Sequence, residues 1–269
     1  MYHSYSMQGK RESNEDYHFI SINNDEHDKN SNYINLLCVF DGHGGKGVSK
    51  YLKENLPGFF TKKYKKNIFL QPNAFIKHVF NVCELLQKEL VESHPKIAYK
   101  CGSTACVIIH YHDVNNKKNI LWSINIGDSR AVLANKNSMA VQLTKDHKPN
   151  SPDERKRIEQ MGGKIEFDGC DWRIKGLSLS RAIGDTDCKP YVICEPQINI
   201  VKLSSYDKFI IIGCDGLWDV INNQDAIEYV QYIIDNNKNK KINYAKALCE
   251  HAYKLGSLDN ITVIVYLLD

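Results

Sequence analysis

The stretch Cys38-Val-Phe-Asp41-Gly42-His43-Gly44-Gly45 joins an apolar run, 36–40, directly to a carboxylate, a histidine and glycines. An apolar run that ends abruptly in polar residues and glycine is typical of a buried strand and the turn that follows it. Asp41 therefore stands at the mouth of a predicted strand. Gly42 has no Cβ, so the backbone can approach other groups closely and bring its carbonyl oxygen near whatever Asp41 holds. The pattern indicates a binding site.

Other acidic residues are placed in the same way beside strand-like runs. They are Asp215 after the run 209–214, Asp259 before the run 261–268, and Glu15 and Asp16 before the run 17–22. If these strands lie side by side in one sheet, the acids gather at one rim of that sheet. Carboxylates held so closely repel each other and take up protons unless cations neutralise them. We interpret the pattern as a site for hard cations.

Length and composition predict one globular domain over residues 1–269. The chain has 42% hydrophobic and 25% charged residues, which are ordinary values for a globular protein. A net charge of +3 and a pI near 8.2 are too mild to indicate nucleic-acid binding. No apolar run approaches the roughly 18 residues that a membrane-spanning helix needs. We expect neither nucleic acid nor membrane as a partner, and we expect a monomer.

Cysteine usage and the N-terminus predict an intracellular protein. The nine cysteines are scattered and include no Cys-x-x-Cys pair, so neither a disulfide framework nor a thiolate zinc site is indicated. The first residues lead into polar sequence without the apolar core of a signal peptide. These features predict a cytoplasmic location, and the nucleus is included as a further compartment.

The order of predicted elements favours antiparallel sheets flanked by helices over a parallel sheet. Apolar spacing and end signals predict helices over 48–56, 72–90, 152–161, 224–234 and 243–255. Further strands are predicted over 104–110, 120–126 and 130–134. The chain lacks strictly alternating strand and helix units, which a doubly wound parallel sheet requires. The segment 163–187, rich in Gly, Asp and Arg, is a candidate flap, and two Lys/Asn-rich insertions have loop composition.

Taken together, the motifs resemble those of the metal-dependent protein phosphatases of type 2C, the PPM family, in the order in which that family carries them. They are Met7-Gln8-Gly9-Lys10-Arg11, Asn14-Glu15-Asp16, Val39-Phe-Asp41-Gly42-His43-Gly44-Gly45, Gly102-Ser-Thr-Ala105, Gly127-Asp-Ser-Arg130, Asp146-His-Lys-Pro149, Ser180-Arg-Ala-Ile-Gly-Asp185, Cys214-Asp-Gly-Leu-Trp-Asp-Val220 and Gly256-Ser-Leu-Asp-Asn260. The resemblance implies an α+β fold, a four-layer α-β-β-α sandwich in which two antiparallel sheets pack face to face between helices.

The resemblance also implies a serine/threonine phosphoprotein phosphatase that depends on two Mg²⁺ or Mn²⁺ ions. By the same resemblance, the metal ligands are Asp41 as the bridge, Glu15, Asp215, Asp259 and the Gly42 carbonyl, with Asp16 holding metal-bound waters. Arg11 is expected to grip the phosphate and His43 to be the acid for the leaving group. Asp146 and Asp219 match positions linked in the family to a third, weaker metal.

Elementary chemistry agrees with these residue types. An all-oxygen ligand set selects hard cations, whereas zinc would draw His or Cys into contact with the metal. Two such ions lower the pKa of a bridging water and produce hydroxide at neutral pH, which can attack phosphorus in line without a covalent intermediate. Arg11 and the cations would balance the charge on the phosphoryl oxygens.

Individual residues also have structural rather than functional interpretations. A lone Asp-Gly pair is more often a turn than a metal site. For Asp128 and Arg130 we favour a buried hydrogen-bonded pair that supports loops, and Asp185 has a similar interpretation. Trp172 could touch a substrate or pack the flap, and both alternatives stay open.

Three further alternatives bear on function. His110 and His112 share a strand face but lack a third ligand, so a metal role is disfavoured. Asn260-Ile-Thr262 matches a glycosylation sequon, which we discount because a glycan beside Asp259 would obstruct the site. The alternative function is a non-catalytic pseudophosphatase that acts as a binding or scaffold module. It would be favoured by loss of a metal carboxylate, of Arg11 or of His43, and all are present.

Overall fold

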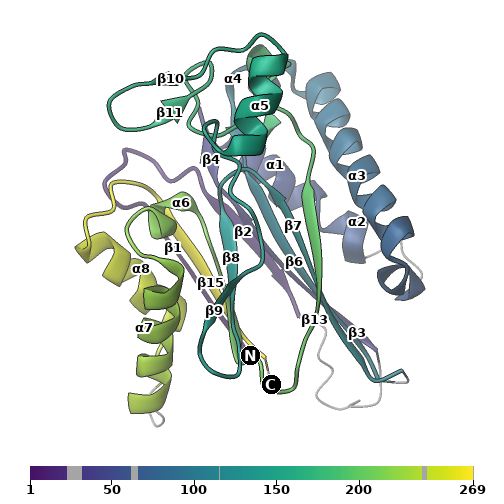
Figure 1. The fold of residues 1–269 in the computed structure, drawn as a ribbon, viewed down its shortest axis with the longest axis vertical. Coiled ribbons are helices and arrows are strands. Elements are labelled where there is room, and N and C mark those ends of the chain that lie inside the picture. Colours follow the sequence, from purple (N-terminus) through teal and green to yellow (C-terminus); the bar gives the residue numbers. More distant parts are fainter. Residues whose placement is uncertain (23–31, 62–65, 115, 238–240, 269) are drawn as a thin grey trace.

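The computed structural model describes residues 1–22, 32–61, 66–114, 116–237 and 241–268. Within these residues, two five-stranded antiparallel sheets form the centre of the molecule (Figure 1). The first sheet has the order β1 (Tyr2–Met7), β15 (Ile261–Leu267), β14 (Phe209–Gly213), β8 (Arg130–Ala134) and β9 (Ala140–Gln142). The second has the order β13 (Gln197–Lys202), β7 (Lys118–Ile126), β6 (Ala105–Asp113), β3 (Tyr33–Phe40) and β2 (Tyr17–Ser21).

Alternation along the central strands divides the apolar residues between two cores. On β3, Leu36, Cys38 and Phe40 face the helices, whereas Leu37 and Val39 face the other sheet. Successive side chains of a strand point to opposite faces, and both faces here are covered, so the run is continuously apolar. The core between the sheets consists of Leu37, Val39, Cys106, Ile108, Leu121, Ile210, Ile212, Ile264 and Tyr266 with their neighbours.

Helices cover the outer face of each sheet (Figure 1). Helices α1 (Gly47–Asn55) and α3 (Pro72–Ser93) pack on the second sheet, and Phe75 and Val79 of α3 lie in that core. Helices α7 (Asn223–Asn236) and α8 (Tyr244–Lys254) pack on the first sheet through residues such as Ile227 and Leu248. The predicted α+β class and the antiparallel sandwich are therefore confirmed.

Shorter elements connect the layers. They are α2 (Gly58–Thr61), η1 (Lys66–Leu70), α4 (Pro95–Lys100), α5 (Pro152–Gln160), η2 (Thr186–Cys188) and α6 (Asp215–Trp218). A small sheet has the order β12 (Ile183–Gly184), β5 (Gly102–Ser103) and β4 (Gly42–His43). The hairpin β10 (Glu166–Phe167) and β11 (Trp172–Arg173) lies in the predicted flap.

One expectation about the strands is wrong. The acid-bearing strands do not lie side by side in one sheet, because β2 and β3 belong to the second sheet and β14 and β15 to the first. Strand β1 was not predicted; it lies near the start of the sequence and pairs with β15 near its end. Residues 23–31 and 238–240, which make up much of the two Lys/Asn-rich insertions, lie outside the described residues, as do residues 62–65.

Candidate active site

A cavity of about 510 Å³ opens at the end of the sandwich where the acid-bearing strands of both sheets meet. The predicted site residues that line it are Arg11, Glu15, Asp41, Gly42, His43, Asp215 and Asp259. Asp16 is buried, with 6% of its surface exposed, and its charge acts on Asp41. The structure thus brings all the predicted site residues to one place.

Strand pairing explains why these acids converge. Tyr17 of β2 pairs with Phe40 of β3, so the acids just before β2 stand beside Asp41 just after β3. In the facing sheet, Gly213 at the end of β14 pairs with Val263 of β15, which brings the chain after β14 next to the chain before β15. The ends of two facing sheets, rather than the rim of one sheet, therefore hold the carboxylates.

The electrostatics of this cluster are unfavourable without cations. Burial raises the pKa of Asp41 well above its ordinary value, and repulsion by Asp215 and Asp16 raises it further. Burial and the charge of Asp128 do the same to the pKa of Asp215. The pKa of Asp16 is raised to about 6, by burial first and then by repulsion from Asp259, against partial compensation by Thr262 and Cys214. Several carboxylates in one place cannot all ionise unless positive charge is added.

The donor atoms fit a hard cation. Within the part of the chain that the structure describes, neither carboxylate oxygen of Asp16 has a hydrogen bond of normal geometry, although both are buried. An oxygen of Asp16, an oxygen of Asp41 and the sulfur of Cys214 lie within 4.8 Å of one another. Burial raises the pKa of Cys214 well above its ordinary value, and its thiol donates to the Asn260 carbonyl at 3.3 Å. The thiol is therefore neutral, and the oxygens are left as the ligands that Mg²⁺ or Mn²⁺ prefers.

Glycine at position 42 is required by close approach rather than by a left-handed backbone. A Cβ there would lie 2.5 Å from the Glu15 carbonyl oxygen and 2.5 Å from Oγ of Ser49. The next residues supply the turn, because Gly44 and Gly45 have φ angles of 68° and 124°. The N–H of Gly45 donates to Oε2 of Glu15 at 2.9 Å. The turn after β3 thus fixes the Glu15 carboxylate beside Asp41.

Arg11 and His43 lie on the cavity wall with acidic partners. The side chain of Arg11 is 60% exposed, and its guanidinium donates to Oδ2 of Asp259 at 2.5 Å. Nε2 of His43 lies 2.7 Å from Oδ2 of Asp185. Burial alone would lower the pKa of His43, but the hydrogen bond and charge of Asp185 raise it above its ordinary value. An imidazole with a raised pKa is suited to donate a proton near neutral pH.

The interpretation of Asp128 and Arg130 as a mutual pair is wrong. Arg130 binds Asp146 through two hydrogen bonds, of 3.0 and 2.5 Å, and Asp128 forms an ion pair with Nζ of Lys148 at 2.6 Å. Asp146 therefore does not fit the expected role beside Asp219, since it pairs with Arg130 and is not among the described residues that line the cavity. Asp219 does line the cavity, and the pKa of its carboxyl is raised by burial and by Asp128, against the charge of Lys148.

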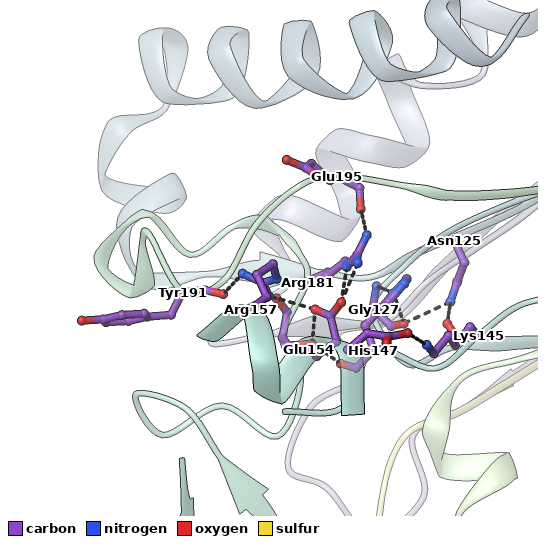
Figure 2. A network of polar contacts seen from close by, with 11 residues as sticks. Asn125, Gly127, Lys145, His147, Glu154, Arg157, Arg181, Tyr191 and Glu195 are labelled. Atoms are coloured by element: carbon purple, nitrogen blue, oxygen red, sulfur yellow. Dashed lines mark hydrogen bonds and ion pairs between the residues drawn. The ribbon is translucent and has the colours of Figure 1, made fainter. Parts of the chain in front are cut away.

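A buried polar network holds the base of the flap to the loop that carries Asp128 (Figure 2). Glu154 of α5, which is 2% exposed, accepts hydrogen bonds from Arg157, Arg181 and Ser180. The Ser180 amide donates to the His147 carbonyl at 2.8 Å, and the single hydroxyl hydrogen of Ser180 is shared between Glu154 and that same carbonyl, whose oxygen lies 3.0 Å from Oγ. The His147 amide donates to the Gly127 carbonyl at 3.0 Å. The network therefore ties α5, the flap base and the residue before Asp128 into one unit.

Two further residues singled out from the sequence, Trp172 and His110, have packing or hydrogen-bond partners outside the cavity. Trp172 packs against Phe167 and lies under the guanidinium of Arg155, and it does not line the cavity. Both ring nitrogens of His110 are hydrogen-bonded, to Tyr266 and Asn119, which agrees with the disfavoured metal role.

Comparison with known proteins identifies the family. The family model described as "Protein phosphatase 2C" matches residues 1–261. The chain belongs to the protein phosphatase 2C family. It is 38% identical over 261 residues to "Probable protein phosphatase 2C 11" of Arabidopsis thaliana, which covers 97% of this chain and 64% of that protein. It is 37% identical to "Probable protein phosphatase 2C 59" of the same plant, over 97% of this chain and 77% of that protein.

Solved structures superpose over nearly the whole chain. A sex-determining protein of C. elegans has a TM-score of 0.82 at 26% identity, covering 100% of this chain and 65% of that one. A phosphatase from Toxoplasma gondii has a TM-score of 0.80 at 24% identity, covering 97% of this chain and 90% of that one. At 24% identity, the similarity to the Toxoplasma gondii structure is evidence of a shared fold alone.

Sequence reasoning missed three contributors to this protein phosphatase 2C cavity. Asp128 had been interpreted as a loop support, yet its charge acts on Asp41 and Asp215. Lys148 and Arg173 both line the cavity and add positive charge to it. Each stands in or near a motif of the family, but only the long-range pairing of loops places them beside the carboxylates.

Proposed function

We propose that the chain is a serine/threonine phosphoprotein phosphatase that depends on Mg²⁺ or Mn²⁺. The observation that carries this proposal is a single cavity that combines buried, mutually repelling carboxylates with Arg11 and His43. Family membership supports the same conclusion, and phosphorylated proteins are the substrates it implies.

The proposed cation ligands are the carboxylates of Glu15, Asp41, Asp215 and Asp259 with the carbonyl of Gly42. Asp16, whose carboxylate oxygens make no hydrogen bond of normal geometry with the described residues, would hold water beside them. When bound, the cations supply charge neutralisation and a water of lowered pKa as the nucleophile for in-line attack. A further cation beside Asp219 is part of the proposal, with Asp128 rather than Asp146 as its neighbour.

The chain's own residues bind the phosphate and handle the proton. Arg11 lies at the cavity rim and can donate two parallel hydrogen bonds to phosphoryl oxygens. The P–O bond to the serine or threonine oxygen breaks, and that oxygen takes a proton from His43. The flap residues Asp171, Arg173 and Leu177–Leu179 complete the wall that faces the substrate.

A cytoplasmic location belongs to the same proposal. All nine cysteines are free, which suits a reducing compartment. Among the described residues, none of the helices combines the length and the apolar character needed to cross a membrane. Interpretation as one domain and as a monomer stays a prediction.

The test is phosphate release from a phosphothreonine peptide in EDTA, Mg²⁺ or Mn²⁺. We expect release with either cation and none in EDTA, because the nucleophile and the charge balance both depend on the cation. A folded protein that binds Mn²⁺ but releases no phosphate from any phosphopeptide would favour the non-catalytic alternative instead.

A further inference from the structure

His43 is held by a buried carboxylate to which the sequence pattern gave only a supporting role. Asp185 is 2% exposed, and its Oδ2 lies 2.7 Å from Nε2 of the His43 imidazole. A carboxylate is costly to bury unless it is hydrogen-bonded to a suitable partner. Because Nε2 is occupied in this way, Nδ1 is the ring nitrogen left to serve the cavity that His43 lines.

The backbone at Gly102, beneath the hydrogen bond between His43 and Asp185, leaves no room for a side chain. In the small sheet, Gly102 of β5 pairs with His43 of β4 on one side and with Gly184 of β12 on the other. A Cβ on Gly102 would lie 2.0 Å from Oδ2 of Asp185 and 2.4 Å from Nε2 of His43. The hydrogen bond therefore crosses the face of Gly102, and only glycine permits it.

Asp185 itself is fixed from elements remote from the cavity. It has a left-handed backbone with φ of 45°, its N–H donates to the Cys101 carbonyl at 3.0 Å, and its carbonyl accepts from Cys188 at 3.0 Å. Gln87 of α3 holds the preceding Gly184 through both amide groups, at 2.8 and 3.3 Å. A non-glycine residue in a left-handed conformation is unusual, and such positions cluster where function over-determines the backbone.

We propose that Asp185 is a positioning residue for the phosphatase reaction, because it fixes the imidazole of His43 with Nδ1 toward the leaving oxygen. This inference rests on the proposed function. As the ester P–O bond breaks, the electron pair goes to the serine or threonine oxygen, and that oxygen takes the proton from Nδ1. Loss of a carboxylate that orients a metal-binding histidine typically costs about 10–100-fold, and we expect a loss of that size for the proton-donating His43.

The test compares two substrates at saturating Mn²⁺: a phosphothreonine peptide and an aryl phosphate whose leaving group needs no proton. The variants are Asp185→Asn, which keeps the volume and tolerates the left-handed backbone, and Gly102→Ala. We expect each to lower kcat for the peptide by about 10–100-fold with KM little changed, and to lower kcat for the aryl phosphate by less than about threefold. Asp113→Asn, at a buried acid at the far end of β6, is the matched control and should not distinguish the substrates.

The double variant with His43→Ala separates positioning from general damage. If Asp185 acts through His43, adding Asp185→Asn to His43→Ala causes little further loss on the peptide. Equal losses on both substrates in Asp185→Asn, or additive losses in the double variant, would overturn the inference.

A measurement that needs no turnover keeps the inference separate from the proposed function. In the metal-free wild type, at a pH where the imidazole is neutral, nitrogen NMR should find the His43 proton on Nε2, since a carboxylate accepts there. His43→Ala assigns the signal, and Asp185→Asn should shift the proton toward Nδ1. An unchanged tautomer in that variant would contradict the inference even if the wild type proved inactive; inactivity itself would count against the proposed function.

Discussion

The carboxylates of this cavity are buried close together, where burial and mutual repulsion disfavour their ionised forms. Asp41 and Asp215 are buried together, and the pKa of each is raised well above the ordinary value by burial and then by neighbouring acids. A fold that keeps such an arrangement gains nothing from it in the absence of cations. The residues are therefore better explained by the ions they attract than by the stability they give.

This reasoning predicts opposite effects of Asp215→Asn on activity and on metal-free stability. The change keeps the volume and removes one repelling charge, so the melting temperature in EDTA should rise. Activity with Mn²⁺ should fall on the order of 10³-fold, because a catalytic cation supplies several kcal/mol. Thermal melts and phosphate release on the same preparations check both; a variant that is destabilised in EDTA would contradict the electrostatic account.

His43→Ala should separate substrates by the quality of their leaving group. A phosphothreonine peptide should lose about 10²-fold or more, because general acids contribute at that level. An aryl phosphate should lose little, since its leaving oxygen departs without a proton. Steady-state kinetics with both substrates decide, and matching losses would remove His43 as the proton donor.

At the scale of elements, α5 is held to the flap base by one buried carboxylate. Glu154 lies among Arg157, Arg181 and Ser180, and although burial opposes its ionisation, these partners lower its pKa to about 2. Removing one partner of a buried ion pair leaves the other charges uncompensated.

We therefore predict that Glu154→Gln destabilises the protein by about 3–5 kcal/mol near neutral pH. Because the pKa in the folded protein is depressed, this stabilisation is present above the ordinary value of 4.5 and is lost as the pH falls toward about 2. Denaturant melts across that range check the trend. The neighbouring Asp153→Asn is the matched control, since its side chain is 78% exposed, and it should change stability little. A penalty for Glu154→Gln that grew as the pH fell would have the wrong sign.

Among the helices and strands, α3 was predicted from the sequence and β1 was not. The period of Phe75, Val79, Cys83, Leu86 and Leu90 predicted α3, whose observed bounds are Pro72–Ser93. Strand β1 was missed because its residues are mostly polar and it is defined by pairing with β15, including Ser6 Oγ at 2.8 Å from Thr262 Oγ1. Local periodicity predicts an element, whereas a distant partner decides its sheet.

For the site residues, too, local sequence patterns predicted positions, whereas partners distant in the sequence were not predicted. Acids at strand ends predicted the cluster, because Asp41 and Asp215 directly follow apolar runs. The partners of Arg130 and His43 could not be predicted, since Asp146 and Asp185 reach them through tertiary packing rather than through spacing. The roles of the cavity residues stay predictions.

Over the whole molecule, the acid cluster predicts a pH dependence that cations should abolish. In EDTA, groups with raised pKa values, among them Asp16 at about 6, stabilise the folded protein while protonated. That contribution is full below their ordinary values and is lost as the pH rises through about 6. Melting temperatures in EDTA should fall over this range, and Mn²⁺ should remove the fall. A cation-independent slope would contradict this account.

The most direct measurement is the anomalous scattering of Mn²⁺ in crystals of the protein grown with that ion. We predict peaks inside the cavity, with carboxylate oxygens of Asp41, Asp215 and Asp259 at about the 2.0–2.6 Å typical of hard cations, and no such peaks in Asp41→Asn crystals. A cavity without manganese in wild-type crystals would contradict the claim that these carboxylates form a catalytic cation site.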